Sequence, residues 1–380
     1  MPRRLLFVVN VDWFFLSHRL PIALAAKANG FDVAVTAAET GSGEEIRDNG
    51  IAFYPLAVSR SRTSVSSELH TIYSLYRRYR LVKPHIVHHV TLKPVIYGSL
   101  AARGLRDTHV VNALSGLGYT FIDPKRSPAT STVVRALLKT ALSHRRSRAI
   151  FQNPDDMQQF VTNGWISSER ADLIQGSGVD CERFSISPEP DGPPVIMLPA
   201  RLLRDKGVVE FVEAARILRG QGVQGRFVLV GEPDLGNPAT IKPAKIAKWV
   251  AEGIVEAWGH SNDMPRTLSE SRIVVLPSYR EGLPKVLLEA AACGRAIVTT
   301  DVPGCRHAVV NEQTGLIVPP RAPIELANAI LRLLRDDRTR LEMGMAGRRR
   351  VEAELSVERI VAQTLAVYDA ILRGHPRVAV

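Results

Sequence analysis

The chain has few cysteines and no long apolar run. Its 380 residues include three cysteines, Cys181, Cys293 and Cys305, and their spacing is not that of a metal site. So small and odd a set argues against a disulfide scaffold and favours a reducing compartment such as the cytoplasm. No stretch approaches about 18 uninterrupted apolar residues, so a membrane-spanning helix is not expected. No internal repeat and no low-complexity segment is visible.

The N-terminus superficially resembles a signal peptide, because two arginines precede an apolar stretch. Asn10 and Asp12 interrupt that stretch, and no small-residue cleavage site follows. We therefore interpret residues 5–11 as a buried first strand that runs into a loop.

Acidic residues are scarce in the first part of the chain. Residues 1–150 carry 21 lysines and arginines against nine acidic residues, whereas residues 151–380 carry 28 against 29, so the net charge of +11 belongs to the first part. Such a basic surface favours an anionic partner, either nucleic acid or anionic lipid.

Short apolar runs alternate with amphipathic helical patterns, which is typical of parallel α/β units. Strands are predicted at 5–11, 32–36, 52–55, 85–88, 109–112, 149–151, 195–199, 227–230, 254–257, 273–276 and 296–299. A proline-rich stretch at 185–194 separates the two series, and the chain length also suggests two domains. We expect two doubly wound Rossmann-like domains, 1–184 and 185–357, with a C-terminal helix at 358–380 packing back on the first.

Ligands of such folds bind at the carboxyl ends of the parallel strands, so the loops that follow strands matter most. We expect those loops to converge on one cleft between two facing sheets. They lie at 11–18, 88–94, 112–121, 201–207, 231–234 and 277–284.

Residues 281–289 read Glu-Gly-Leu-Pro-Lys-Val-Leu-Leu-Glu. Pro284 favours the first position of a helix, whose free backbone amides attract anions. Two acids, Glu281 and Glu289, are unexpected there unless they hold hydroxyl groups or a developing cation. The alternative is a capped surface helix with two solvated acids.

A basic pair follows the strand at 195–199. Arg201 and Lys206 stand at the opening of a helix, where a guanidinium and an ammonium beside helix amides form a compact diphosphate site. The alternative is an ordinary basic loop.

Together these motifs resemble the nucleotide-sugar site of retaining glycosyltransferases of family 4, which have the GT-B fold. Further stretches that fit the family are Gly-Ser-Gly-Val-Asp-Cys-Glu-Arg-Phe at 176–184, Val-Gly-Glu at 230–232 and Trp-Gly-His at 258–260. The resemblance spans essentially the whole second half of the chain.

The resemblance implies a role for each matching residue. Arg201 and Lys206 would bind the diphosphate, Glu289 the ribose hydroxyls, and Glu281 would lie beside the transferred sugar as a catalytic residue. The remaining contacts fall on backbone and base: Gly282 and Leu283 would touch sugar hydroxyls and phosphate, and Gly259 and His260 would border the base. His260 alone could equally be a surface histidine.

The family's account of retention is a short-lived oxocarbenium-like state in which the departing phosphate takes the proton of the acceptor. The chain has no Asp-X-Asp motif, which agrees with a site that needs no metal and no cofactor besides the UDP-sugar substrate.

The first half departs from the family pattern. Its first loop, 10–18, lacks the usual glycine pair, and the position of a frequent histidine is taken by Asn112 and Ser115. We consider Asn112 and His18 as catalytic candidates, with His18 opening a helix on the acceptor side. His88 and His89 are further candidates, and for each histidine a structural role is as probable as a functional one.

The stretches Ser17-His-Arg-Leu-Pro, Thr91-Leu-Lys-Pro, Ser115-Gly-Leu-Gly-Tyr and Phe151-Gln-Asn-Pro-Asp-Asp resemble a narrower group. These are bacterial enzymes, including N-acetylgalactosaminyltransferases, that extend sugars on undecaprenyl diphosphate. The resemblance implies a UDP-sugar donor giving a hexose or N-acetylhexosamine to a lipid-diphosphate-linked acceptor.

Residues 132–148 combine apolar residues at helical spacing with arginines and lysine, the layout of a helix on an anionic bilayer. The alternative is a helix packed on the sheet. We expect an enzyme peripheral at the cytoplasmic membrane face. A soluble sugar acceptor stays open as an alternative, whereas a nucleic-acid-binding module would leave Glu281 and Glu289 unexplained.

Overall fold

The computed structural model describes residues 2–56, 65–115 and 128–374, and the chain divides into two compact units. Unit 1 comprises Met1–Ser177 with Glu358–Val380, and unit 2 comprises Gly178–Val357. The boundary predicted between 184 and 185 falls inside unit 2. Val179 forms a β-bridge with Ser356, and Phe184 is buried in a core of unit 2, so the residues before 185 fold with that unit.

The proline-rich stretch at 185–194 belongs to unit 2 as well and is not a free connection. The guanidinium of Arg295 donates to Ser187 Oγ at 2.5 Å and to the carbonyl of Pro188 at 3.1 Å. Arg340 forms two hydrogen bonds with the carboxylate of Glu189, at 2.8 and 2.7 Å. Charged groups that satisfy backbone carbonyls in this way order a segment that has no regular structure of its own.

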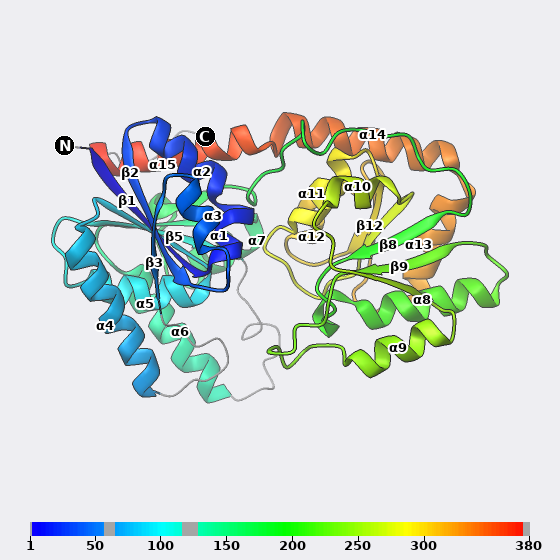
Figure 1. The fold of residues 1–380 in the computed structure, drawn as a ribbon, viewed down its shortest axis with the longest axis horizontal. Coiled ribbons are helices and arrows are strands. Elements are labelled where there is room, and N and C mark those ends of the chain that lie inside the picture. The colour runs from blue at the N-terminus through cyan, green and yellow to red at the C-terminus, as the bar shows by residue number, and fades with distance from the viewer. Residues whose placement is uncertain (1, 57–64, 116–127, 375–380) are drawn as a thin grey trace. The chain divides into compact units, whose positions relative to one another are not determined.

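Unit 1 is built on a seven-stranded parallel sheet in the order β3-β2-β1-β4-β5-β6-β7 (Figure 1). Its strands are β1 (Arg3–Val11), β2 (Phe31–Ala38), β3 (Ala52–Pro55), β4 (Ile86–Val90), β5 (His109–Leu114), β6 (Ser147–Phe151) and β7 (Ala171–Leu173). The short β7 escaped prediction because three residues carry no readable alternation.

Helices cover both faces of this sheet, so neighbouring residues of one strand enter different cores. Leu5 and Phe7 of β1 belong to one core, and Leu6 and Val8 to the other, as the period of two requires. One face packs against α1 (Asp12–His18), α2 (Leu20–Ala28), α3 (Gly43–Asp48) and α15 (Val357–Arg373); the other packs against α4 (Val65–Val82), α5 (Leu92–Ala102), α6 (Pro128–Leu142) and α7 (Pro154–Thr162).

The C-terminal helix packs on unit 1, as expected from its apolar pattern. Val367, Tyr368 and Ile371 of α15 are buried in the same core as β1 and β2. The hydroxyl of Tyr368 lies 2.5 Å from Nδ1 of His88 on β4. A segment distant in sequence therefore completes the first core.

Unit 2 has a six-stranded parallel sheet in the order β10-β9-β8-β11-β12-β13. Its strands are β8 (Val195–Pro199), β9 (Arg226–Val230), β10 (Glu256–Gly259), β11 (Ile273–Leu276), β12 (Ala296–Thr300) and β13 (Leu316–Val318). Its helices are α8 (Val208–Gly220), α9 (Pro243–Ala251), α10 (Met264–Ser269), α11 (Lys285–Ala292), α12 (Cys305–Ala308), α13 (Pro323–Arg335) and α14 (Asp337–Glu354), with a short 3₁₀ turn at Arg204–Lys206. A further 3₁₀ turn, Ser168–Arg170, belongs to unit 1. The α/β class with two doubly wound parallel sheets is thus confirmed.

None of the helices in the described ranges is both long and apolar enough to cross a membrane.

Candidate active site

The carboxyl ends of β8, β9 and β11 bring three loops of unit 2 together. A side-chain carbon added to Gly207 would lie 2.1 Å from the carbonyl oxygen of Pro277, and one added to Gly231 would lie 2.1 Å from that of Ala200. Both glycines have a positive φ, +73° and +131°. Only glycine lets these backbones approach so closely, so the loop packing depends on it.

Lys206 and Glu281 meet at this edge, although 75 residues separate them. The ammonium of Lys206 lies 2.5 Å from Oε1 of Glu281, and the hydroxyl of Ser278 donates to the same oxygen at 2.7 Å. The two charged side chains are 22% and 12% exposed. Lys206, predicted to bind the diphosphate, and Glu281, predicted to lie beside the sugar, therefore form a largely buried ion pair.

The turn that carries Glu281 is fixed by its backbone. The amide of Glu281 donates to the carbonyl of Pro303 at 3.3 Å. Gly304, with φ +85°, leaves room for this turn, since a side-chain carbon there would lie 2.6 Å from the carbonyl oxygen of Gly282. The carboxylate is consequently presented from a rigid support.

Tyr279 fastens the same loop to the turn that carries Lys206. Its amide donates to the carbonyl of Asp205 at 2.9 Å, and its hydroxyl donates to Oε1 of Glu210 at 2.6 Å. The guanidinium of Arg321 lies 4.6 Å from the ring centre. Sequence reasoning missed these partners: Asp205 lies in the turn of Lys206, Glu210 on α8 and Arg321 after β13.

Arg201 is held by a different acid. Its guanidinium donates to Oδ2 of Asp234 at 2.8 Å and is half exposed. Asp234 lies in the loop after β9, which the strand-end rule marked as relevant without identifying this residue. The two residues predicted to bind a diphosphate thus pair with different carboxylates, Arg201 with Asp234 and Lys206 with Glu281.

Glu289 is buried on α11, where its carboxylate lies 3.2 Å from the ammonium of Lys285. Pro284 is the N-cap residue of α11 and not its first residue, so the helix begins one position later than predicted. Gly282 and the buried Leu283 precede the cap. The two acids of the motif therefore differ in setting, one in a turn and one inside a helix.

Gly259 ends β10 with φ +71°, and its carbonyl accepts a hydrogen bond from the amide of Gly231 at 2.7 Å. His260 follows on the surface and is exposed. Gly259 is thereby joined to the loop after β9, which leads to Asp234.

In unit 1, residues 12–18 form helix α1, where a loop was predicted. Burial raises the pKa of Asp12, but hydrogen bonds from Thr40, Ser42 and Trp13 outweigh it, and the pKa lies below its ordinary value. Asp12 thereby ties α1 to the loop after β2. The prediction that His18 opens a helix was wrong, because His18 is the last residue of α1.

The ring of His18 stacks on Phe14 with centres 4.0 Å apart, and its Nδ1 lies 2.6 Å from Ser17 Oγ. It is half-buried on the segment that directly follows β1. His18 thus lies on α1, the helix that directly follows the carboxyl end of β1 in unit 1.

Asn112 is completely buried within β5. Its Oδ1 lies 2.8 Å from Nδ1 of His89 and accepts a hydrogen bond from Ser99 at 3.0 Å. Nε2 of His89 in turn lies 2.9 Å from the hydroxyl of Tyr79, and burial lowers the pKa of His89 to about 4. Both ring nitrogens of His89 have partners inside the unit, and Asn112 Oδ1 is one of them. Asn112 therefore has no role in the mechanism that we propose. Of the stretch Ser115-Gly-Leu-Gly-Tyr, residues 116–119 lie outside the described residues.

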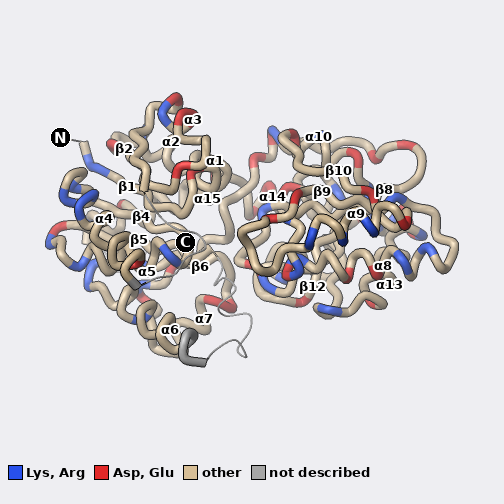
Figure 2. The backbone as a smooth tube through the Cα atoms, turned by 60° about the horizontal axis from the view of Figure 1, so that its bottom comes forward, with Lys and Arg blue, Asp and Glu red and all other residues tan. Residues whose placement is uncertain are grey.

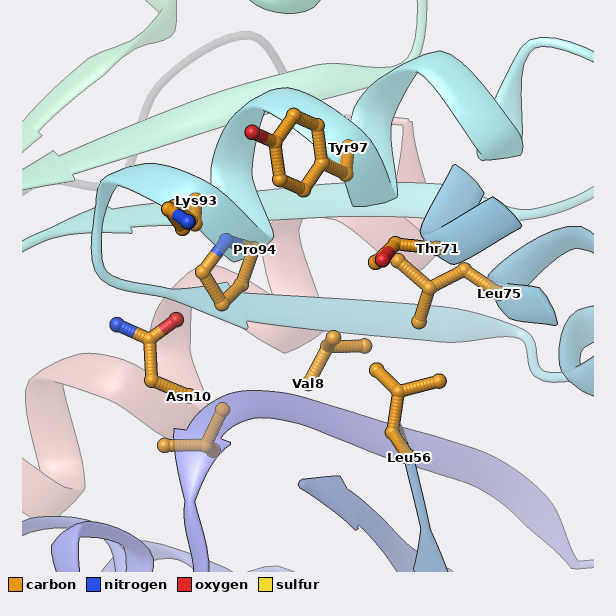
Figure 3. Close-up of a pocket in the computed structure, with 9 residues that line it drawn as sticks. Val8, Asn10, Leu56, Thr71, Leu75, Lys93, Pro94 and Tyr97 are labelled. Carbon is orange, nitrogen blue, oxygen red and sulfur yellow. The ribbon is translucent and has the colours of Figure 1, made fainter. Parts of the chain in front are cut away.

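A narrow hollow at the same edge of unit 1 is lined by Asn10, Thr71, Lys93 and Tyr97 together with apolar side chains (Figure 3). Just before it, Thr91 has φ +75°, which is unfavourable for a β-branched residue. Backbone strain of this kind costs about 1–3 kcal/mol and is commonly found at functional sites. The strained residue lies directly after β4, at the edge where ligands of such sheets bind.

The predicted membrane segment at 132–148 divides in two. Leu138, Ala141 and Leu142 of α6 are buried against the sheet, whereas Val133 and Leu137 are exposed. The segment then continues into β6, where the buried Arg148 pairs with Asp172 at 2.6 Å. Arg148 therefore belongs to the core and not to a basic surface.

Two doubly wound parallel sheets, with a C-terminal helix that packs on the first, are the architecture of GT-B glycosyltransferases. The fold is that of sucrose-phosphate synthase from Thermosynechococcus elongatus, with a TM-score of 0.82 and 20% identity over 98% of this chain and 100% of that chain. At this identity the likeness establishes the fold alone.

Two family models match the sequence. "Glycosyl transferase 4-like" matches residues 4–153, and "Glycosyl transferases group 1" matches residues 193–336. Together they cover most of the chain, which belongs to this family of glycosyltransferases and is a hexosyltransferase.

Two curated relatives align over most of the chain. One is the N,N'-diacetylbacillosaminyl-diphospho-undecaprenol alpha-1,3-N-acetylgalactosaminyltransferase of Campylobacter jejuni, 28% identical over 95% of this chain and 99% of the relative. The other is the UDP-Gal:alpha-D-GlcNAc-diphosphoundecaprenol alpha-1,3-galactosyltransferase of Escherichia coli, 25% identical over 80% of this chain and 81% of the relative.

Proposed function

We propose that the protein transfers a hexose or N-acetylhexosamine from a UDP-sugar to a saccharide linked to undecaprenyl diphosphate, with retention of configuration. The observation that carries the proposal is the Lys206–Glu281 pair, held with Ser278 at the carboxyl edge of the unit 2 sheet. In our proposal Lys206 is the cation for the leaving diphosphate and Glu281 the anion for the developing sugar cation.

The donor proposal assigns the diphosphate to Lys206 and Arg201, each of which has a carboxylate partner in the ligand-free chain. The diphosphate would replace Glu281 and Asp234 as their counter-ion. Charge-assisted hydrogen bonds to phosphate are among the strongest that these side chains form. UDP binding would therefore release the carboxylate of Glu281 for the sugar.

Around the diphosphate, Glu289 would hold the ribose hydroxyls, and the backbone of Gly282 and Leu283 would contact the sugar. Gly259 and His260 would border the base. The buried setting of Glu289 supports this role. Its residue is 8% exposed and its carboxylate pairs with Lys285, and a buried carboxylate is stabilised by further hydrogen bonds such as those from ribose hydroxyls.

Retention requires the new bond to form on the face from which UDP leaves. In our proposal the departing phosphate oxygen takes the proton of the acceptor hydroxyl while Lys206 and Arg201 stabilise its charge. Glu281 stabilises the oxocarbenium-like sugar. No metal ion has a part in these steps, and UDP-sugar is the one small-molecule requirement.

The acceptor proposal rests on the two relatives, whose names specify diphosphoundecaprenol-linked sugars and alpha-1,3 linkages. His18 is assigned to the acceptor side because α1 directly follows β1 at the carboxyl edge of unit 1. The alpha linkage is also that of common UDP-hexose donors, which supports retention.

Membrane attachment is proposed through α4 and α6, which both pack against α5 on one face of unit 1 (Figure 1). Leu69 and Tyr73 are exposed on α4, as are Val133 and Leu137 on α6. Exposed basic residues accompany them: Arg77, Arg80, Arg135 and Lys139. Blue stretches of backbone along α4 in Figure 2 mark Lys and Arg. Apolar side chains interleaved with basic ones favour an anionic bilayer at the cytoplasmic face of the membrane.

The decisive experiment incubates the protein with a panel of UDP-sugars and prenyl-diphosphate-linked sugars and identifies products by mass and anomeric configuration. A new alpha-linked sugar on the lipid acceptor supports the proposal. Transfer to free sugars alone would overturn the lipid acceptor, and an inverted product would overturn retention.

Flotation with vesicles of anionic and neutral lipid tests the attachment. We expect salt-sensitive binding to anionic vesicles, reduced by a Val133→Ser, Leu137→Ser double variant. A matched control is Val250→Ser, which removes an exposed apolar residue from unit 2. Equal binding of both variants would contradict the proposed surface.

A further inference from the structure

Arg19 is a buried arginine that forms no ion pair with any residue that the structure describes. It is 3% exposed, donates to the carbonyl of His18 at 3.0 Å and to Ser115 Oγ at 3.2 Å, and its Nε has no partner among the described residues. Within the described residues no carboxylate forms an ion pair with it. By contrast, the buried Arg148 of the same unit binds Asp172 through two hydrogen bonds. An unpaired buried charge is costly, so such a group calls for an anion.

His88 supplies a second unpaired donor to the same place. It is 1% exposed, and its Nε2 has no partner in the part of the chain that the structure describes. Burial raises the pKa of Tyr368, so the phenol keeps its proton, and its hydroxyl lies 2.5 Å from Nδ1 of His88. With the phenol as the donor of this bond, the hydrogen of the neutral imidazole is on Nε2, which then donates to a ligand.

Both side chains line one cavity of unit 1. The space is narrow and partly open to solvent, and its lining also includes Gln152, Gly176 and Thr364. The hydroxyl of Thr364 is already engaged with the carbonyl of Ile360 at 2.8 Å. Two donors without described partners thus line a cavity whose described lining holds no acid.

The cavity lies where ligands of such sheets bind. Ala113 comes from the end of β5, and Gln152 and Ile174 directly follow β6 and β7. Unpartnered buried polar atoms of unit 1 gather on β1, β4 and β5 or in the segments after β1 and β4. They are Asn10 Oδ1, Arg19 Nε, His88 Nε2, Thr91 Oγ1 and Asn112 Nδ2. Native proteins leave few such atoms without a partner, so a ligand or water is expected here.

We propose that Arg19 and His88 form an anion site in unit 1 that receives an oxygen of the acceptor's diphosphate. The identity of the anion rests on the proposed function, whereas the site itself does not. Nε of Arg19 and Nε2 of His88 donate to one phosphate oxygen, and the rest of the group stays at the open side of the cavity. An oxygen atom is about the size of the water that such a space admits.

The test measures melting temperature with inorganic pyrophosphate while saturating UDP occupies unit 2. Pyrophosphate is expected to raise the melting temperature of the wild type and to have no effect on Arg19→Met. Since Met removes an unpaired buried charge, this variant should melt no lower than the wild type without ligand. Arg19→Lys keeps the positive charge and loses the planar guanidinium with its several N–H donors, so it should show part of the pyrophosphate shift.

Arg148→Met is the matched control, because it removes a buried arginine that has its carboxylate. It should melt lower than the wild type yet keep the shift with pyrophosphate. In transfer assays Arg19→Met should raise KM for the lipid-linked acceptor at least tenfold with little change in KM for the donor.

An unchanged pyrophosphate shift in Arg19→Met overturns the site, as does a melting temperature of the free variant as low as that of Arg148→Met. If the pyrophosphate shift in melting temperature depends on Arg19 but the protein transfers sugar to no prenyl-diphosphate acceptor, the anion site stands and the proposed function is rejected. Inorganic phosphate and a short prenyl-diphosphate sugar, run in parallel, separate a free anion from the acceptor.

Discussion

The ion pair of Lys206 and Glu281 yields a prediction in which stability and activity fall while UDP affinity does not. Glu281→Ala leaves the ammonium of Lys206 without its anion. Breaking a fully buried pair costs about 3–5 kcal/mol and an exposed one about 0–1 kcal/mol. With side chains 22% and 12% exposed, the pair lies between these limits, and we expect a loss of about 2–3 kcal/mol.

For a domain of about 150–250 residues, 1 kcal/mol shifts Tm by about 2–4 °C, so Tm should fall by about 4–12 °C. UDP should bind at least as tightly as to the wild type, because its diphosphate no longer competes with a carboxylate for Lys206. A gain of about 1–2 kcal/mol corresponds to about 5–30-fold. Transfer should drop by about 10²–10³-fold, the usual cost of removing one group that stabilises transition-state charge.

Calorimetric titration with UDP, thermal unfolding and product quantification test the three expectations in one preparation. Glu256→Ala is the control, because Glu256 pairs with Arg226 on the surface of the same unit. Its loss should cost at most about 1 kcal/mol and leave UDP binding unchanged. A tenfold weaker UDP affinity in Glu281→Ala, or turnover within a few-fold of the wild type, would refute the reasoning.

Other predictions concern separate parts of the molecule. Asp234→Asn frees Arg201 from its carboxylate, so UDP should bind a few-fold more tightly by calorimetric titration; weaker binding would assign Asp234 itself to the ligand. Burial lowers the pKa of His89 to about 4, so its stabilising contribution is complete above pH 6.5 and lost as the pH falls to 4. That contribution is about 3 kcal/mol, and denaturant unfolding of His89→Gln should depend less on pH than that of the wild type. Transfer measured in excess EDTA should equal that in Mg²⁺, and a loss that Mg²⁺ restores would contradict the metal-free mechanism.

Much of the fold could be predicted from local pattern. Three strands, β3, β8 and β11, have the predicted bounds, because apolar runs bounded by polar turns leave little choice. Residues 12–18 escaped this reasoning, since α1 depends on Asp12 receiving hydrogen bonds from the distant Thr40 and Ser42. Contacts of that kind carry no local signal.

The candidate site was predictable in its members and not in its pairings. Lys206, Glu281, Arg201 and Glu289 were identified from motifs whose chemistry is local: cations and acids beside helix starts. Which acid neutralises which cation depends on loop packing around Gly207, Gly231 and Gly304. Arg19 gave no such signal, because an arginine inside an amphipathic stretch is usually a solvated residue.

Sequence by itself therefore determined the class of fold and supplied the candidate residues for a diphosphate and a sugar, because periodicity and side-chain chemistry are properties of short segments. Tertiary structure alone decided that Lys206 rests on Glu281 and Arg201 on Asp234, that Arg148 is buried with a carboxylate partner, and that Arg19 is buried without one among the described residues. Burial sets the energetic cost of a charge, and burial is a property of the folded chain.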